Sequence, residues 1–211
     1  MKKLLTLLLG LLLITTSFSQ KRDITLEDLW QNYTFYPSYI GGFNSMNDGE
    51  HYSTMEKTDD GQEIIKYQFK NGKKVRTLFK STDFEIPRIN GYTFSDDEKQ
   101  LLLETETKNI YRHSSKSIYY IYNIFTDKLK KISDDKVMYA TFSPNANKVA
   151  YVFENNLYIK NIRSGKITQV TNDGKKNHII NGASDWVYEE EFALVRSFEW
   201  APDGENIAYY K

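Results

Sequence analysis

The sequence contains no cysteine and no excess of either charge, and both absences narrow its function. Because none of the 211 residues is a cysteine, a disulfide framework, a thiol nucleophile and a cysteine zinc site are excluded. The 28 basic residues balance the 28 acidic ones, whereas a nucleic-acid binder needs a basic excess to neutralise phosphates. We therefore expect no nucleic-acid partner. With 40% hydrophobic residues, the chain can still bury a sizeable core.

Histidine is also scarce. His51, His113 and His178 are 62 and 65 residues apart, and no pair of them has the spacing of metal ligands. We expect no metal site and no cofactor.

The first nineteen residues have the order of a secretory signal peptide. A basic start at Lys2 and Lys3 precedes an apolar run over residues 4–14. Ser17 and Ser19 then supply the small residues at −3 and −1 before a cleavage site. The alternative is an uncleaved anchor, but the run is about half the roughly 20 residues that a spanning helix needs. We therefore expect a cleaved signal peptide at residues 1–19 and an exported protein, periplasmic or secreted, that touches a membrane only if this segment stays uncleaved.

A short N-terminal helix and a linker are predicted for residues 20–40. Thr25 can cap the helix together with Asp28 three residues later. Four apolar side chains then share one helical face: Leu26, Leu29, Trp30 and Tyr33.

From residue 41 onward, one phrase made of a turn and a strand recurs. FSDDEKQL at residues 94–101 matches FSPNANKV at 142–149 and WAPDGENI at 200–207, with a weaker copy, NDGEHY, at 47–52. Each copy has an aromatic strand end, a tight turn suited to Pro, Asp, Asn or Gly, and an apolar strand. The aligned turn positions are spaced by 49, 48 and 58 residues: Asp48, Asp97, Asn145 and Asp203.

A second hairpin alternates with the first. YIYNI at 120–124 precedes a turn at 126–128, and YIKNI at 158–162 precedes a turn at 164–166. Two hairpins in about 48 residues make four strands, which is typical of a β-propeller blade. The predicted fold is therefore all-β: an incomplete β-propeller of about three and a half four-stranded blades over residues 41–211, after the short helix. A sandwich with coincidental turns is the alternative.

Two insertions interrupt the repeat, and insertions of this kind map to loops that commonly carry function. About ten extra residues, including YRHS at 111–114, precede the third strand of one blade. The 58-residue spacing contains DWVYEEEF at 185–192.

The charged residues of these insertions suggest a binding site. Adjacent glutamates can accept charge-assisted hydrogen bonds from a protonated α-amino group. Arg112 presents a planar donor fork to a carbonyl or carboxylate. The alternatives are a solvated acidic helix end, whose carboxylates complement the helix dipole, and an ordinary surface arginine.

The same runs resemble the dipeptidyl peptidase IV family of prolyl oligopeptidase-type serine peptidases. DWVYEEEF at 185–192 is similar to the family's double-glutamate motif, and YRHS at 111–114 resembles its arginine region. The phrase WAPDG at 200–204 and the opening ITLED at 24–28 also fit, so the resemblance covers essentially the whole mature chain. Phe192 follows the glutamates directly, where some members have a valine first.

The resemblance implies a substrate-recognition propeller of a serine exopeptidase that releases X-Pro or X-Ala dipeptides from peptide N-termini. In that family an eight-bladed propeller sits over an α/β-hydrolase domain. Glu190 and Glu191 would bind the substrate's free amino terminus, and Arg112 would hold the carbonyl of the first residue pair. Glu189 maps to no substrate contact. Peptide N-termini with Pro or Ala second are the implied partners, and a homodimer is compatible with the complete protein.

A nucleophile is not found in the sequence. A hydrolase of this kind needs G-x-S-x-G, and GASDW at 182–186 lacks the second glycine. We therefore expect that the catalytic α/β-hydrolase domain and every catalytic residue lie outside this sequence, and that the chain alone is an inactive fragment. A non-enzymatic exported propeller that binds peptides or proteins is the competing interpretation. A TolB-type periplasmic propeller shares the turn phrase but does not explain the three glutamates.

Overall fold

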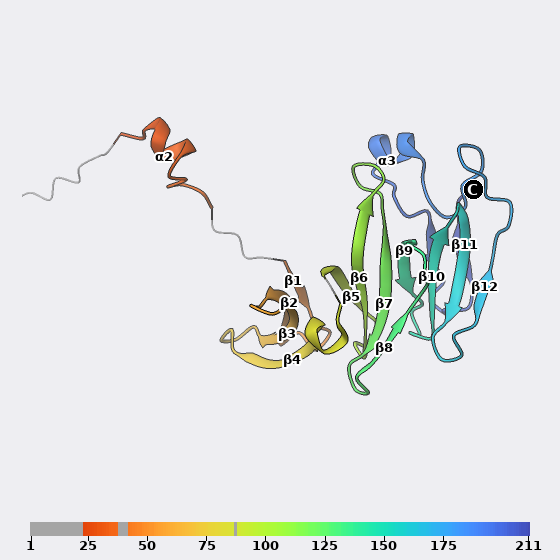
Figure 1. The fold of residues 1–211 in the computed structure, drawn as a ribbon, viewed down its shortest axis with the longest axis horizontal. Helices are drawn as coiled ribbons and strands as arrows, with labels where there is room; N and C mark the ends of the chain where they lie inside the picture. The colour runs from red at the N-terminus through yellow and green to blue at the C-terminus, as the bar shows by residue number, and fades with distance from the viewer. Residues whose placement is uncertain (1–22, 38–41, 87) are drawn as a thin grey trace, which may run out of the picture. The chain divides into compact units, whose positions relative to one another are not determined.

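Antiparallel sheets follow one another along most of the described chain (Figure 1). The computed structural model describes residues 23–37, 42–86 and 88–211. Contacts divide the chain into two compact units, Met1–Ile40 and Gly41–Lys211. The predicted signal peptide at 1–19 lies outside the described residues. None of the helices in the described ranges is long and apolar enough to cross a membrane.

The first unit contains the predicted short helix, α2, at Leu26–Trp30. Its capping box is confirmed: the Asp28 amide donates to Thr25 Oγ1 at 3.1 Å, and the Thr25 amide donates to Asp28 Oδ2 at 3.2 Å. The apolar side chains expected on one face are exposed: Leu26, Leu29, Trp30 and Tyr33. Local capping therefore defines where this helix begins.

The second unit is a partial β-propeller, as predicted. Three blades are four-stranded antiparallel sheets whose strands pair in chain order, and a two-stranded sheet follows them. Blade 1 consists of β1 (Phe43–Ser45), β2 (His51–Lys57), β3 (Gln62–Gln68) and β4 (Lys74–Lys80). Blade 2 consists of β5 (Ile89–Phe94), β6 (Gln100–Asn109), β7 (Ser115–Asn123) and β8 (Lys128–Lys131). Blade 3 consists of β9 (Met138–Phe142), β10 (Lys148–Phe153), β11 (Asn156–Asn161) and β12 (Ile167–Gln169).

The remaining elements complete the described chain. Blade 4 is represented by β13 (Phe198–Trp200) and β14 (Ile207–Tyr209). The 3-10 helix η1 (Ser81–Phe84) links blades 1 and 2, and helix α3 (Trp186–Phe192) lies between β12 and β13.

The recurring turn has the same chemistry in all four blades. In each copy, a side-chain oxygen accepts the backbone N–H two residues later, which closes an Asx turn. The acceptor and donor pairs are Asp48 with Glu50, Asp97 with Lys99, Asn145 with Asn147, and Asp203 with Glu205. The residue after each acceptor has a left-handed backbone: Gly49, Glu98, Ala146 and Gly204. The repeat read from the sequence is therefore a repeat of turn geometry.

The core lies between neighbouring blades. Successive side chains of a strand point to opposite faces of its sheet, and both faces are buried here. Leu101 and Leu103 thus pack toward blade 1, whereas Leu102 packs toward blade 3. In the same way, Val149 faces blade 2 and Ala150 faces blade 4. A strand buried on both faces explains the continuous apolar runs of the central strands.

The insertion in blade 2 differs from the expectation of a loop. Most of its extra residues lengthen β6 to ten residues and β7 to nine, against six in each of β10 and β11. The ladder continues past an irregularity between Thr105 and Lys108, because paired strands satisfy backbone groups that a loop would leave to solvent. The result is the tall hairpin of Figure 1, which leaves residues 110–114 as its tip.

Candidate functional site

Helix α3 carries the three consecutive glutamates. The Asp185 side chain caps its start by accepting the Tyr188 amide at 3.0 Å, and Ala193, with a left-handed backbone, ends it. Consecutive side chains of a helix diverge by about 100°. Glu189, Glu190 and Glu191 therefore point in different directions, and their surroundings differ.

Glu189 points into the protein and is 1% exposed. Its Oε1 accepts the backbone N–H of His113 at 2.6 Å and that of Ser114 at 3.2 Å, and its Oε2 accepts the Ser114 hydroxyl. Burial alone would raise the pKa of this carboxyl, but these hydrogen bonds favour the ionised form and hold the pKa below its ordinary value. Glu189 is therefore a buried carboxylate whose charge is satisfied by the tip of the β6–β7 hairpin.

Glu190 points to the arginine of the same hairpin tip. Arg112 Nη1 lies 3.1 Å from Glu190 Oε2, and the two side chains are 72% and 17% exposed. Most of the arginine side chain is thus open to solvent, and the guanidinium has further N–H donors that can reach a ligand. Glu191, the next residue, is exposed. The structure brings Arg112 and Glu190 together and places Glu191 beside them on the helix.

Two adjacent carboxylates lie near the C-terminal end of α3. Glu190 and Glu191 lie in the last turn of the helix, where no basic residue is present, and the negative end of the helix dipole adds to their charge. The alternative of an acidic helix end that complements the dipole requires carboxylates at the start of a helix. It therefore does not describe these two residues, and a bound cation would relieve the repulsion between them.

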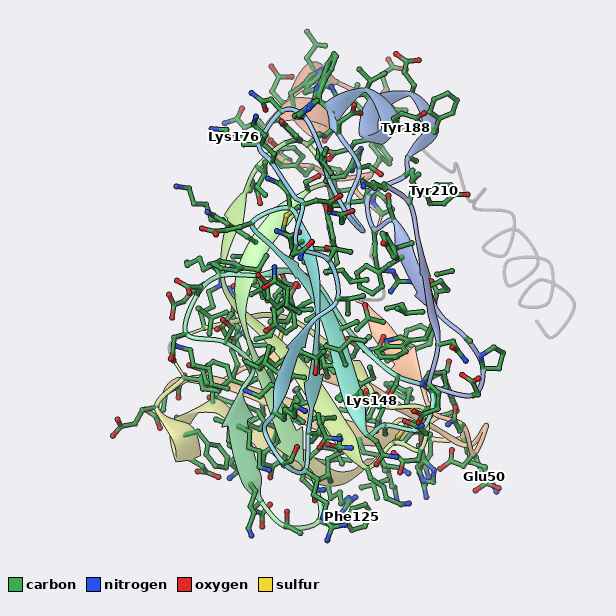
Figure 2. The ribbon with its side chains drawn as sticks, turned by 90° about the vertical axis from the view of Figure 1, so that its right-hand side faces the viewer. Glu50, Phe125, Lys148, Lys176, Tyr188 and Tyr210 are labelled. Carbon is green, nitrogen blue, oxygen red and sulfur yellow. The ribbon has the colours of Figure 1, made fainter. Side chains whose placement is uncertain are left out.

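Apolar surface lies next to these charges. Trp186, Tyr188 and Phe192 are each at least half exposed on α3. An open cavity of about 440 Å³ borders the helix at Tyr188 and Phe192 and is also lined by His178, Ile180 and Tyr210. In Figure 2, Tyr188 and Tyr210 lie toward the end of the second unit opposite Glu50 and Phe125.

Two residues near the glutamates were missed by the sequence reasoning. The sequence shows Ser114 only as a near neighbour of Arg112, yet its hydroxyl donates to Glu189. Tyr139 of β9 has a left-handed backbone, with φ of 56°, and its buried hydroxyl makes no hydrogen bond of normal geometry in the described chain. Burial raises the pKa of this phenol to about 12, and Ser114 and Glu189 are close enough to affect it. The short run around Arg112 could have pointed to Ser114, whereas nothing in the sequence singles out Tyr139.

The described residues offer no group of three or more His, Asp or Glu side chains arranged to hold a metal ion. The charged groups at this site are the Arg112 guanidinium and the carboxylates of Glu190 and Glu191.

Comparison with known proteins identifies relatives of the chain. The family model of the dipeptidyl peptidase IV (DPP IV) N-terminal region matches residues 95–211. Prolyl endopeptidase FAP of Bos taurus is 29% identical over 198 residues, which are 90% of this chain and 25% of that protein. Dipeptidyl peptidase 4 of Felis catus is 33% identical over 195 residues, covering 90% of this chain and 24% of that protein.

A solved structure agrees with these matches. The crystal structure of Porphyromonas gingivalis dipeptidyl peptidase 4 superposes with a TM-score of 0.73 at 38% identity, over 87% of this chain and 26% of that one. The chain thus spans about a quarter of the length of these relatives.

Proposed function

The chain belongs to the family of the dipeptidyl peptidase IV N-terminal region, and from this premise we propose that it is the substrate-recognition propeller of a dipeptidyl peptidase IV-like serine exopeptidase. In this proposal it binds the free amino terminus of a peptide, and an α/β-hydrolase domain beyond this sequence releases an X-Pro or X-Ala dipeptide. The observation that carries the proposal is the ion pair between Arg112 and Glu190.

The proposed ligand is an ammonium group. An α-amino terminus is largely protonated at neutral pH, since its ordinary pKa is about 8, and its N–H groups bond most strongly to carboxylates. Glu190 is partly buried and Glu191 is exposed beside it, so the pair can accept from a ligand that approaches from solvent. The two carboxylates repel each other in the free protein, and a bound cation offsets this repulsion.

Arg112 has a second role in the proposal. Its contact with Glu190 uses part of the guanidinium, and the exposed remainder can donate to a backbone carbonyl of the bound peptide. Recognition of both the ammonium and the first carbonyl fixes the direction of the peptide. The position of the cleaved bond then follows, because only a bond two residues from the amino terminus can reach a nucleophile held at a fixed distance.

The proposal includes a location for the protein outside the cytoplasm. The order of residues 1–19 is that of a secretory signal, so we place the protein in the periplasm or outside the cell, where it meets peptides with free amino termini. The proposed partners are peptides with Pro or Ala at the second position.

Substitution of the two glutamates tests the proposal. In the protein at its natural length, Glu190→Gln and Glu191→Gln should each reduce transition-state stabilisation by about 2–5 kcal/mol. This lowers kcat/KM on a Gly-Pro anilide by about 30-fold to a few thousand-fold. Glu50→Gln is the matched control, since Glu50 is exposed at the opposite end of the second unit (Figure 2). A loss below threefold for both variants, with folding intact, would remove these glutamates from the binding site.

A further inference from the structure

One buried side chain joins the two insertions of the propeller. Within the described chain, the Glu189 carboxylate accepts hydrogen bonds from His113 and Ser114, the two residues that follow Arg112 at the hairpin tip. Glu189 itself directly precedes Glu190 on α3. Arg112 and Glu190 are therefore each one position along the chain from this buried connection, and Glu191 is two positions from it.

The strength of this connection differs from that of the neighbouring ion pair. The contact between Arg112 and Glu190 involves a side chain that is 72% exposed, and an exposed pair contributes little to holding two elements together. Glu189 is 1% exposed, and a buried carboxylate that loses its donors leaves an uncompensated charge. Movement of α3 away from the hairpin tip is thus opposed by Glu189 far more than by Arg112.

A residue of a third element, β9, lies close to the Glu189 carboxylate and its donors. Tyr139 belongs to β9 of blade 3, and its buried hydroxyl lies near Ser114 and Glu189. Its left-handed backbone is unusual for an aromatic residue in a strand. Residues from blade 2, blade 3 and α3 therefore meet around one carboxylate, and water is largely excluded from it.

We propose that Glu189 is a positioning residue for recognition of the amino terminus: by binding the tip of the β6–β7 hairpin, its buried carboxylate fixes the spacing between Arg112 and the pair Glu190 and Glu191. This inference rests on the proposed function. Glu189 makes no contact with the substrate and acts through the geometry of its neighbours, because a recognition site loses much of its effect when its groups are displaced by about 1 Å.

A double-mutant cycle tests the inference in the protein at its natural length. The measured quantity is the selectivity for the free amino terminus, the ratio of kcat/KM on Gly-Pro anilide to that on its N-acetylated form. Glu189→Gln should lower this ratio at least about tenfold. In a Glu190→Gln background the same substitution should change it less than threefold, because the group that Glu189 positions is already disabled. A purely structural role would lower activity on both substrates equally and leave the ratio unchanged.

A second variant keeps the test decisive if Glu189→Gln does not fold. Ser114→Ala removes one donor but retains the carboxylate and both backbone hydrogen bonds, so it should lower the ratio in the same direction by a smaller factor. Glu50→Gln, which makes the same chemical change as Glu189→Gln at an exposed position, should leave the ratio unchanged.

The results distinguish failure of the positioning role of Glu189 from failure of the proposed recognition of an amino terminus. The inference is overturned if the unmodified protein discriminates against the acetylated substrate while the folded variants, Glu189→Gln or Ser114→Ala, discriminate equally well. If the unmodified protein itself does not discriminate and Glu190→Gln has no effect, the proposed function fails, and the inference that rests on it fails too.

Discussion

Arg112 Nη1 lies 3.1 Å from Glu190 Oε2, and this contact joins the two places where the chain departs from its blade period. One residue is at the tip of a lengthened hairpin in blade 2, and the other is on a helix inserted before blade 4. The two insertions therefore meet at this contact. Blades with shorter hairpins, such as β10–β11, do not extend to it in this way.

Loss of the arginine should reduce activity without reducing stability. Because Arg112 is mostly exposed, Arg112→Ala should change the free energy of unfolding by less than about 1 kcal/mol. It should reduce transition-state stabilisation, calculated from kcat/KM on a Gly-Pro anilide, by about 1.5–3 kcal/mol, the usual contribution of a charged hydrogen bond. Steady-state kinetics and urea unfolding measure the two quantities. Arg112→Lys, which keeps the charge but not the planar fork, should recover only part of the activity. A parallel loss of stability and activity would contradict this assignment.

Acid should weaken the connection made by Glu189. The pKa of this carboxyl is lowered in the folded protein from its ordinary value of 4.5, so the folded state binds its proton less readily than the unfolded state. Its contribution to stability is complete above the ordinary value and is lost as pH falls through the folded pKa. The stability advantage of the unmodified protein over Glu189→Gln should therefore shrink as pH falls below about 4.5.

Unfolding midpoints in urea across this pH range check the acid prediction. The pKa values of Asp48, Asp97 and Asp203 are also lowered, but these groups are present in both proteins and cancel in the difference. A difference that does not change with pH would show that the Glu189 charge does not support the fold.

The recurring turns allow a matched comparison of two glycines. Gly49 and Gly204 have φ values of 68° and 69°, so alanine at either position adopts a strained left-handed backbone, at a cost of about 1 kcal/mol. A Cβ at Gly204 would lie 2.6 Å from Asn145 Nδ2, whereas one at Gly49 meets nothing within 4 Å. Gly204→Ala should therefore lower the free energy of unfolding by about 1–2 kcal/mol more than Gly49→Ala. Equal urea midpoints for the two variants would show that the contact between blades 3 and 4 does not constrain this turn.

The blade pattern could be predicted because its determinants are local. Asp48, Asp97, Asn145 and Asp203 each close a turn with a backbone amide two residues away, and such chemistry can be read from a few consecutive letters. The capping of α2 by Thr25 was readable for the same reason.

The interior of the site could not be predicted in this way. Glu189 bonds to an amide 76 positions earlier, so its burial depends on how two distant insertions meet. In the sequence it is the first of three equal letters, and the resemblance assigned it no contact. The insertion around Arg112 was expected to be a loop, because sequence spacing counts extra residues but does not show that they pair as strands.

We propose that Glu190 and Glu191 bind a positively charged amino terminus. The most direct measurement compares kcat/KM on a Gly-Pro anilide and on its N-acetylated form in the protein at its natural length. Acetylation removes the charge but leaves the scissile bond intact, so we predict a loss of at least about 30-fold that is largely absent in Glu190→Gln. Equal kcat/KM on the two substrates would contradict the claim.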